Sequence, residues 1–582
     1  MHSTSDSKIW LTLAFVSTNF NHRPPPARSL FLSNPVTLLN LMLSLPNDPR
    51  CHSFNLKLKE NPLFPVHLSY IQQKWQVISR DEAFQQFFQA ELDRWTIHKR
   101  FLKFEKRSIN KLNATHGPPG SGKSFFLDAI AELCLASRSG DSDKKEWADN
   151  ILRVTLPSDV SADFDIHITP EERNQLLDEL LNRTVVVPIT YISRTSTPFD
   201  DENPGVALRM LFSFFFEHEE YIKSEWQKFV DFIIQNYDVN KLTLSTASEC
   251  ILSYQPNINL DGSQKPCRIF LLLDELMKCC YKDGQFGPQI NIILTAIGRN
   301  SDAMASFSSI VTTLDQQPVR ISATKSGRSI NWLPLKPING SILFPQEKYP
   351  NEAFQMLVND CNDHPLTLQI LAQGITRHKW GPSERYHRML NDLLTDIELV
   401  SRMGLKPTLY QIIPAILNQR VSPEKYGYKL QKTYAELITE RSYINSLTHE
   451  DSFIPIISSI TLFRFARASK NDEGDDGLIA LILSDMLEFE QNGYFESFEK
   501  FHAGWEALKR TILAILIEDG YYKHNSFSLS SFYNTSIQYN ANEFNPEAFY
   551  FMPRKCKVVN LKHHWPESLI LEIIHSFPTS NP

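Results

Sequence analysis

The stretch that decides the fold is Gly117-Pro118-Pro119-Gly120-Ser121-Gly122-Lys123-Ser124, followed directly by Phe125. It satisfies G-x-x-x-x-G-K-[ST], the pattern of a phosphate-binding loop (Walker A). Glycines allow consecutive backbone N–H groups to turn inward around an anion with no Cβ in the way. We therefore predict that residues 117–125 bind a nucleoside triphosphate. Lys123 would act on the β- and γ-phosphates, and the Ser124 hydroxyl would ligate Mg²⁺.

The residues on either side of this loop predict a strand, the loop and then a helix. Apolar residues from Phe125 to Leu133 recur at helical spacing, which places the loop at a helix N-terminus, where the dipole favours negative charge. The preceding segment, residues 109–116, is more polar than a buried parallel strand normally is. It therefore predicts a strand that is short or lies near a sheet edge. A chance match to the motif is disfavoured because the chain has only 20 glycines in 582 residues.

A second decisive stretch is the apolar run of residues 268–273, which ends in Asp274 and Glu275. This is the pattern of a Walker B strand, in which a central parallel strand delivers an acid beside the Mg²⁺. Asp274 is the candidate metal ligand, together with Ser124. Glu275 is the candidate catalytic residue, together with Lys123, because it would orient or deprotonate an attacking water. The alternative is an acidic strand end at the surface.

Further runs complete a βα pattern around these two motifs. Residues 185–191 and 307–314 predict buried strands, residues 206–237 a long helix with an aromatic core stripe, and residues 330–334 a last strand. The strand 307–314 is expected between the two motif strands, so Thr312 or Thr313 would contact the γ-phosphate or water, unless they simply cap the strand. Arg328 would face a phosphate or be a solvated loop residue. The fold class is α/β: a P-loop NTPase with a central parallel sheet of the additional-strand (ASCE) type.

Length and composition set the remaining bounds. A chain of 582 residues with 42% hydrophobic content should form about three to four domains. Its net charge of −7 does not indicate nucleic-acid or membrane binding, and its eight scattered cysteines suggest a reduced, intracellular protein. No apolar run reaches transmembrane length, so no membrane partner is expected. The run at residues 9–16 lacks a basic flank and a cleavage site, which makes secretion unlikely.

Composition shifts predict the domain boundaries. Residues 1–65 form a poorly defined segment, 66–107 a helical lead-in and 108–345 the NTPase domain. Residues 346–466 would form a helical lid or bundle, with helices at 368–377, 383–399, 407–417 and 424–447. The polar stretch 467–477 is expected as a linker, and residues 478–582 as a small α+β C-terminal region.

These motifs together resemble the P-loop NTPase domain of Crinkler and retrotransposon-hot-spot proteins. The similarity rests on HGPPGSGKS, on Val-Pro-Ile-Thr-Tyr followed by Ala-Leu-Arg-Met-Leu-Phe, on FLLLDEL, and on the SGR segment before Trp332. Asp363-His364-Pro365-Leu366 also resembles the Gly-Leu-Pro-Leu turn of signalling (STAND-type) NTPases, whose proline approaches the adenine. The resemblance implies ATP and Mg²⁺ as cofactors and a nucleotide contact for Pro365.

The resemblance also raises a nuclease hypothesis for the C-terminus, where a restriction-endonuclease-like domain often follows in this family. A helix at 493–508 with Glu496 and Glu499, then Pro546-Glu547 and then residues 558–562 follow the expected order. Asn560 replaces a charged ligand, which weakens a Mg²⁺ site. Three interpretations stay open: an unrelated cap, a degenerate nuclease-like fold, or an active nuclease.

Three functions follow from the sequence, with the first favoured. The chain would hydrolyse ATP with Mg²⁺ to drive a conformational switch. Alternatively, it is a slow nucleotide-dependent binding switch with an unknown protein partner, or a nucleic-acid-processing protein that uses its C-terminal region. A small-molecule kinase is disfavoured by the long separation between the loop and Asp274 and by the adjacent Glu275.

Overall fold

The computed structural model describes most of the chain from residue 32 to residue 522 and two short strands beyond it. Its main ranges are 32–51, 56–60, 80–100, 110–117, 120–135, 169–191, 203–217, 223–254, 266–276, 289–314, 316–336, 338–361, 364–400, 408–417, 445–449, 452–457, 459–488 and 494–522, with a few shorter pieces.

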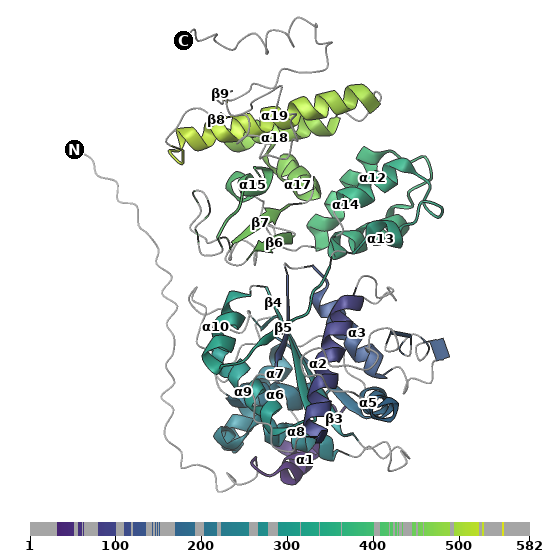
Figure 1. Cartoon of the computed structure of the whole chain (residues 1–582), viewed down its shortest axis with the longest axis vertical. Helices are drawn as coiled ribbons and strands as arrows, with labels where there is room; N and C mark the ends of the chain where they lie inside the picture. The colour runs from purple at the N-terminus through teal and green to yellow at the C-terminus, as the bar shows by residue number, and fades with distance from the viewer. Residues whose placement is uncertain are drawn as a thin grey trace, which may run out of the picture.

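A five-stranded, all-parallel sheet forms the centre of the larger body, in the order β2-β3-β4-β1-β5 (Figure 1). Its strands are β1 (Leu112–His116), β2 (Thr184–Thr190), β3 (Arg268–Asp274), β4 (Phe307–Thr313) and β5 (Ile330–Trp332). Strand β4 lies between β1 and β3, as the sequence predicted. Strand β1 is short and lies next to the edge strand β5, which fits its polar composition. The P-loop NTPase-like α/β fold class is confirmed.

Helices cover both faces of the sheet, and for this reason β2, β3 and β4 are buried along their whole length. One face packs against α2 (Asp81–Arg100), α3 (Lys123–Leu135) and α5 (Pro170–Asn182). The other packs against α1 (Pro35–Ser44), α6 (Asn203–Phe215), α7 (Lys223–Asn236), α8 (Leu244–Ser253), α9 (Gln289–Ala303) and α10 (Gln317–Ser326). Side chains alternate along β3, so that Leu271 joins one core and Leu272 the other.

The long helix expected over residues 206–237 is two helices, α6 and α7. Helix α6 ends at Phe215 because an upstream segment takes its last carbonyls: the Lys59 amide donates to Phe215 O at 2.9 Å, and Lys59 Nζ donates to Ser213 O at 2.5 Å. Phe216 then forms an isolated β-bridge with Leu58. The aromatic stripe is buried, as expected, and Phe212 packs its ring 5.2 Å from that of Phe229.

Residues 32–51, which the sequence left undefined, pack into the same core. Leu38 and Met42 of α1 are fully buried, and α1 lies against α8. Two 3-10 turns, η1 (Leu45–Asn47) and η2 (Pro49–Cys51), follow α1, and a third, η4 (Val239–Lys241), precedes α8.

Two further hydrophobic cores lie beyond the sheet body, toward the top of Figure 1. The first gathers α11 (Gly340–Leu343), α12 (Glu352–Asp360), α13 (Pro365–His378) and α14 (Tyr386–Val400). We call residues 338–400 the helical region. The second gathers α15 (Leu409–Ile416), α17 (Ser459–Ser469), α18 (Asp475–Glu488) and α19 (Tyr494–Glu518).

Parts of this upper half differ from the sequence expectations. The helix expected over 424–447 is not continuous, because Asn445–His449 is strand β6 and pairs antiparallel with β7 (Ser452–Ile456). The stretch 467–477, expected as a linker, contains the end of α17, a turn and the start of α18, and these two helices pack together.

The helix expected at 493–508 is present within α19. Strands β8 (Phe527–Ser528) and β9 (Tyr550–Phe551) pair with each other. The proposed nuclease positions Glu547 and Asn560 lie outside the described residues.

Candidate nucleotide-binding site

The phosphate-binding loop connects the carboxyl end of β1 to the first residue of α3. Gly120 and Gly122 have φ of +82° and +87°, a left-handed conformation that side chains rarely adopt. A Cβ on Gly120 would also lie 2.8 Å from His364 Cε1 and from Leu366 Cβ. These two positions therefore need glycine for both conformation and space. Pro118 and Pro119 lie outside the described residues.

Lys123 lies folded over this loop. Its ammonium donates to the carbonyl of Gly117 at 2.7 Å, and its side chain is buried. The next residues, Ser124 and Phe125, are half-buried in the first turn of α3. The loop, the lysine and the start of the helix thus have the arrangement that the motif predicts.

The loop and the acidic strand end meet directly. Ser124 Oγ donates to Asp274 Oδ2 at 2.7 Å, although the two residues are 150 positions apart. Asp274 is completely buried at the carboxyl end of β3. Burial raises the pKa of Asp274 to about 6, and the charge of Glu275 adds to this increase. The hydrogen bonds from Ser124 and Thr312 oppose it.

Thr312 connects the two acids. Its hydroxyl donates to Asp274 Oδ1 at 2.7 Å and accepts from the backbone N–H of Glu275 at 2.9 Å. The sequence proposes that Thr312 contacts the γ-phosphate or the water, and this stays a prediction. In the structure its hydroxyl is bonded to the Asp274 carboxylate and the Glu275 backbone. Thr313, the other candidate, is fully buried and lies opposite His116 in the β1–β4 register.

Glu275 follows the strand in an unusual conformation. Its φ of +53° lies in the left-handed region, which costs a non-glycine residue about 1–2 kcal/mol. The bond from its N–H to Thr312 holds this turn and directs the chain away from β3. Backbone strain of this kind is often found at functional sites.

His116, the last residue of β1, marks the opposite side of the site. Its Nε2 contacts Nε2 of Gln316, and the edge of its ring meets Trp332 at 5.4 Å between centroids. Burial lowers the pKa of His116 to about 4, and the positive charges of Lys123 and Arg320 lower it further. The imidazole is therefore neutral at physiological pH. Sequence analysis did not single out His116 or Gln316.

The start of α13 lies on the outer side of the loop. The Leu366 N–H donates to Gly120 O at 3.2 Å, and a Cβ on Gly122 would lie 3.8 Å from Pro365. His364 caps the helix, because its Nδ1 accepts from the Thr367 N–H at 3.4 Å. The structure thus places Pro365 beside the loop. Asp363 lies outside the described residues.

Arg80 is a second residue that sequence analysis missed. It precedes α2, is fully buried, and donates from Nη2 to the loop carbonyl of Ser121 at 3.1 Å. Its Nη1 donates to Lys336 O. No sequence pattern identifies such contacts, because the acceptors are main-chain carbonyls that every residue carries.

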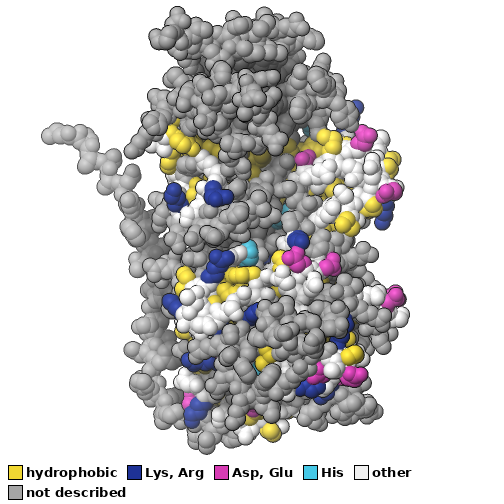
Figure 2. Space-filling view, in the orientation of Figure 1, with side chains coloured by type: hydrophobic (Ala, Val, Ile, Leu, Met, Phe, Trp, Pro, Cys, Tyr) yellow, Lys and Arg dark blue, Asp and Glu magenta, His cyan; other side chains and the backbone are white. Residues whose placement is uncertain are grey.

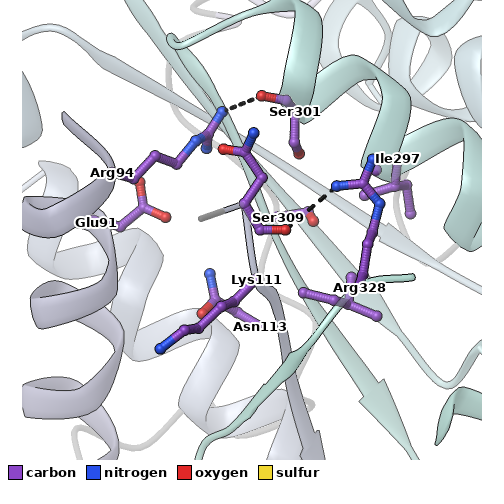
Figure 3. A pocket seen from close by; sticks show the side chains of 11 residues that line it. Glu91, Arg94, Lys111, Asn113, Ile297, Ser301, Ser309 and Arg328 are labelled. Atoms are coloured by element: carbon purple, nitrogen blue, oxygen red, sulfur yellow. Dashed lines mark hydrogen bonds between the residues drawn. The ribbon is translucent and has the colours of Figure 1, made fainter. Parts of the chain in front are cut away.

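Arg328 lies at the other end of the sheet, where it neither faces a phosphate nor is solvated. It pairs with Asp302, and its side chain is only 6% exposed. It lines a small cavity with Arg94, Lys111 and Ser309, where β1 begins rather than ends (Figure 3). The length of β1, about 15 Å, separates this cavity from the phosphate-binding loop.

A hydroxyl and a carboxylate are oxygen ligands that suit Mg²⁺, whose remaining positions are commonly filled by substrate phosphates and water. Ser124 at the start of α3 and Asp274 at the end of β3 carry these two oxygens. Among the described residues, no group of three or more His, Cys, Asp or Glu side chains gathers as a separate metal site. The donor set therefore fits a Mg²⁺ ion that is held jointly with a nucleotide.

Positive side chains do not gather into one patch on the face shown in Figure 2, where the described Lys and Arg residues are spread over both halves. No helix in the described part of the chain has the length and hydropathy needed to cross a membrane.

The chain is similar to known proteins in structure, but it matches no family profile and no curated sequence. One structural neighbour is a Walker-type ATPase of Pyrococcus abyssi, at 12% identity and a TM-score of 0.32, covering 69% of this chain and 98% of the other. A TM-score this low does not extend the fold assignment, which rests on the sheet order and the two motifs. The resemblance to Crinkler proteins stays a prediction.

Proposed function

We propose that this chain is a P-loop NTPase that binds ATP with Mg²⁺ and hydrolyses it to drive a conformational switch. The observation that carries the proposal is the 2.7 Å bond between Ser124 Oγ and Asp274 Oδ2. It brings the last residue of one motif against the acid of the other, as a shared metal site requires.

Each site residue has a role in this proposal. Loop N–H groups within 117–122, apart from the two prolines, which have none, would surround the phosphates, and Lys123 would exchange its bond with Gly117 O for phosphate oxygens. Ser124 and Asp274 would hold Mg²⁺, which neutralises the developing charge on the phosphates when bound. Glu275 would orient or deprotonate the attacking water.

The acidic pair favours hydrolysis over transfer to another substrate. Asp274 and Glu275 are consecutive, and the hydroxyl of Thr312 is bonded to the Asp274 carboxylate and to the Glu275 backbone N–H, so Thr312 holds the Glu275 backbone beside Asp274. A metal ligand with an adjacent acid is what activation of a water molecule needs. The proposed motion concerns the helical region, whose helix α13 contacts the loop through Leu366.

The decisive experiment is Mg²⁺-dependent ATP hydrolysis by wild type, Lys123→Ala and Glu275→Gln. We expect Lys123→Ala to lose nucleotide binding. Glu275→Gln should bind ATP within about threefold of wild type and turn it over at least about a hundredfold more slowly. Glu249→Gln, at an exposed position on α8, is the matched control and should behave as wild type.

Turnover that Glu275→Gln leaves unchanged would remove the hydrolase assignment. Tight ATP binding with almost no wild-type turnover would favour the slow binding switch. Hydrolysis that rises when DNA is added would favour nucleic-acid processing, which is the possible role of the C-terminal region. ATP consumption that depends on an added acceptor would indicate a kinase.

A further inference from the structure

The phosphate-binding loop is held from its outer side as well as lined on its inner side. In such loops the amides turn inward to the ligand, which leaves carbonyls facing outward. Two of these carbonyls have partners from distant parts of the chain. Gly120 O accepts from the Leu366 N–H of α13, and Ser121 O accepts from the guanidinium of Arg80.

Arg80 is held in a position from which it bridges the phosphate-binding loop and the segment at Lys336. Its own carbonyl accepts from the Phe84 N–H at 3.0 Å, in the first turn of α2, and its side chain has no exposed surface. The planar guanidinium donates to Ser121 O and to Lys336 O with two different nitrogens. Burial lowers the pKa of Arg80 to about 10, so the group stays charged at neutral pH.

Lys336 lies in the connection between the sheet and the helical region. This connection begins at Leu333, whose N–H donates to Ala114 O of β1 at 2.8 Å. It ends near Ile338, which belongs to the core of the helical region. The Lys336 side chain forms an exposed ion pair with Glu82 of α2, so the start of α2 contacts this residue twice.

We propose that Arg80 is a positioning residue that couples the phosphate-binding loop to the helical region. Because one guanidinium bonds both carbonyls, a shift of Ser121 when nucleotide binds displaces the connection at Lys336. The Leu366–Gly120 bond attaches the same helical region to the neighbouring loop residue. This inference rests on the proposed nucleotide binding and adds the route by which the helical region responds.

The test combines nucleotide affinity with hydrogen exchange. Affinity is measured with a fluorescent ADP analogue in the presence of Mg²⁺, and exchange is followed in peptides from α12 and α13 with and without saturating nucleotide. Wild type should show slower exchange there when nucleotide is bound. Arg80→Gln should bind about tenfold more weakly, and at saturation should lose at least about half of that nucleotide-dependent protection.

Two further variants separate coupling from simple loss of structure. Glu82→Gln removes the exposed contact to the same Lys336 and keeps both carbonyl bonds, so it should match wild type, because surface ion pairs contribute little. Arg80→Lys keeps the charge and the aliphatic stem but lacks the planar fork. It should recover nucleotide affinity to within about threefold of wild type and still show reduced protection in α13. This variant also supplies the test if Arg80→Gln does not fold.

The outcomes are distinct. A wild-type chain that binds no nucleotide would remove the proposed function and this inference with it. Nucleotide binding without any change of exchange in α12 and α13 would overturn the coupling alone. Wild-type protection in saturated, folded Arg80→Gln or Arg80→Lys would also overturn it.

Discussion

Both ends of the parallel sheet bury charged side chains, but these side chains have different bonding partners at the two ends. At the amino end, Arg268 pairs with Glu91 at 3.0 Å and Arg328 pairs with Asp302, so these two buried cations each face an anion. Arg94, also buried there, donates to Ser308 Oγ and to the carbonyls of Ser301 and Met304. At the carboxyl end, the Lys123 ammonium is bonded to a loop carbonyl.

Asp274 extends this contrast, because hydroxyls of Ser124 and Thr312 satisfy its carboxylate at the carboxyl end. These hydroxyls and the carbonyl carry no net charge. A metal ion could therefore bind to Asp274, and phosphates to Lys123, in their place. Burial is common to both ends, and the buried ion pairs of Arg268 and Arg328 distinguish the amino end from the carboxyl end, where we propose that nucleotide binds. The following variants test that distinction, from the largest expected effect to the smallest.

At the amino end, Glu91→Leu removes the carboxylate that faces Arg268. The Arg268 charge would stay buried, with Glu179 at 3.8 Å as its remaining ion-pair partner among the described residues. We expect a loss of about 3–5 kcal/mol in the free energy of unfolding, measured by urea denaturation. Nucleotide affinity of the folded protein should stay within about twofold of wild type. Weakened binding without lost stability would contradict the comparison.

Ser124→Ala and Ser308→Ala remove equivalent hydroxyls at opposite ends. Ser124 Oγ donates to Asp274 at 2.7 Å, and Ser308 Oγ donates to Glu91 at 2.5 Å. Ser124→Ala should lose about 1 kcal/mol of stability, and Ser308→Ala about 1–3 kcal/mol, because the Ser308 hydroxyl also accepts from the buried Arg94 guanidinium at 2.6 Å. Only Ser124→Ala should lower Mg²⁺-dependent ATP turnover, by about a hundredfold, or about 2.7 kcal/mol. Equal turnover in the two variants would show that the ends do not differ in function.

His116→Gln tests a neutral group beside the loop. The folded pKa of about 4 lies below the ordinary value of 6.5, so the unfolded chain binds more protons between these values. His116 by itself should therefore lower the stability of wild type as pH falls from 6.5 to 4, by about 2–3 kcal/mol. The raised pKa of Asp274 acts in the opposite direction in wild type and variant alike. The variant should lose less over the same range. Parallel stability–pH curves from urea denaturation would show that His116 is not the group responsible.

Thr312→Val tests the link between the two acids while keeping the shape of the side chain. The variant loses the bond to Asp274 Oδ1 and the acceptor for the Glu275 N–H. We expect turnover to fall about tenfold, or about 1.4 kcal/mol, with KM for ATP nearly unchanged. A rise in KM at constant kcat would instead indicate that Thr312 contacts the nucleotide.

Local chemistry made much of this architecture predictable. The apolar runs at 185–191, 268–273 and 307–314 are strands that are buried on both faces, and such strands leave a strong pattern. The Thr169-Pro170-Glu171-Glu172 start of α5 is a sequence pattern typical of a helix N-terminus, and it forms a capping box, with the Glu172 N–H donating to Thr169 at 3.2 Å. The meeting of Ser124 with Asp274 followed from the two motifs.

The remaining features depend on contacts between distant segments. Helix α6 ends at Phe215 because the Lys59 amide pairs there, and the aromatic periodicity continues past that point. Arg80 and the Leu366 N–H bind loop carbonyls, which carry no side-chain signature. Arg328 was misplaced because its partner, Asp302, lies on α9, while Arg328 itself lies between α10 and β5, and no sequence pattern links the two.

The left-handed backbone of Glu275 has a consequence for the evolution of this site. A glycine there would relieve the strain and stabilise the folded chain by about 1 kcal/mol, while removing the carboxylate. Selection for thermal stability alone would therefore favour glycine over glutamate at position 275. Glu275→Gly should melt at a higher temperature than wild type in a calorimeter and hydrolyse no ATP, a trade of activity for durability at a single position.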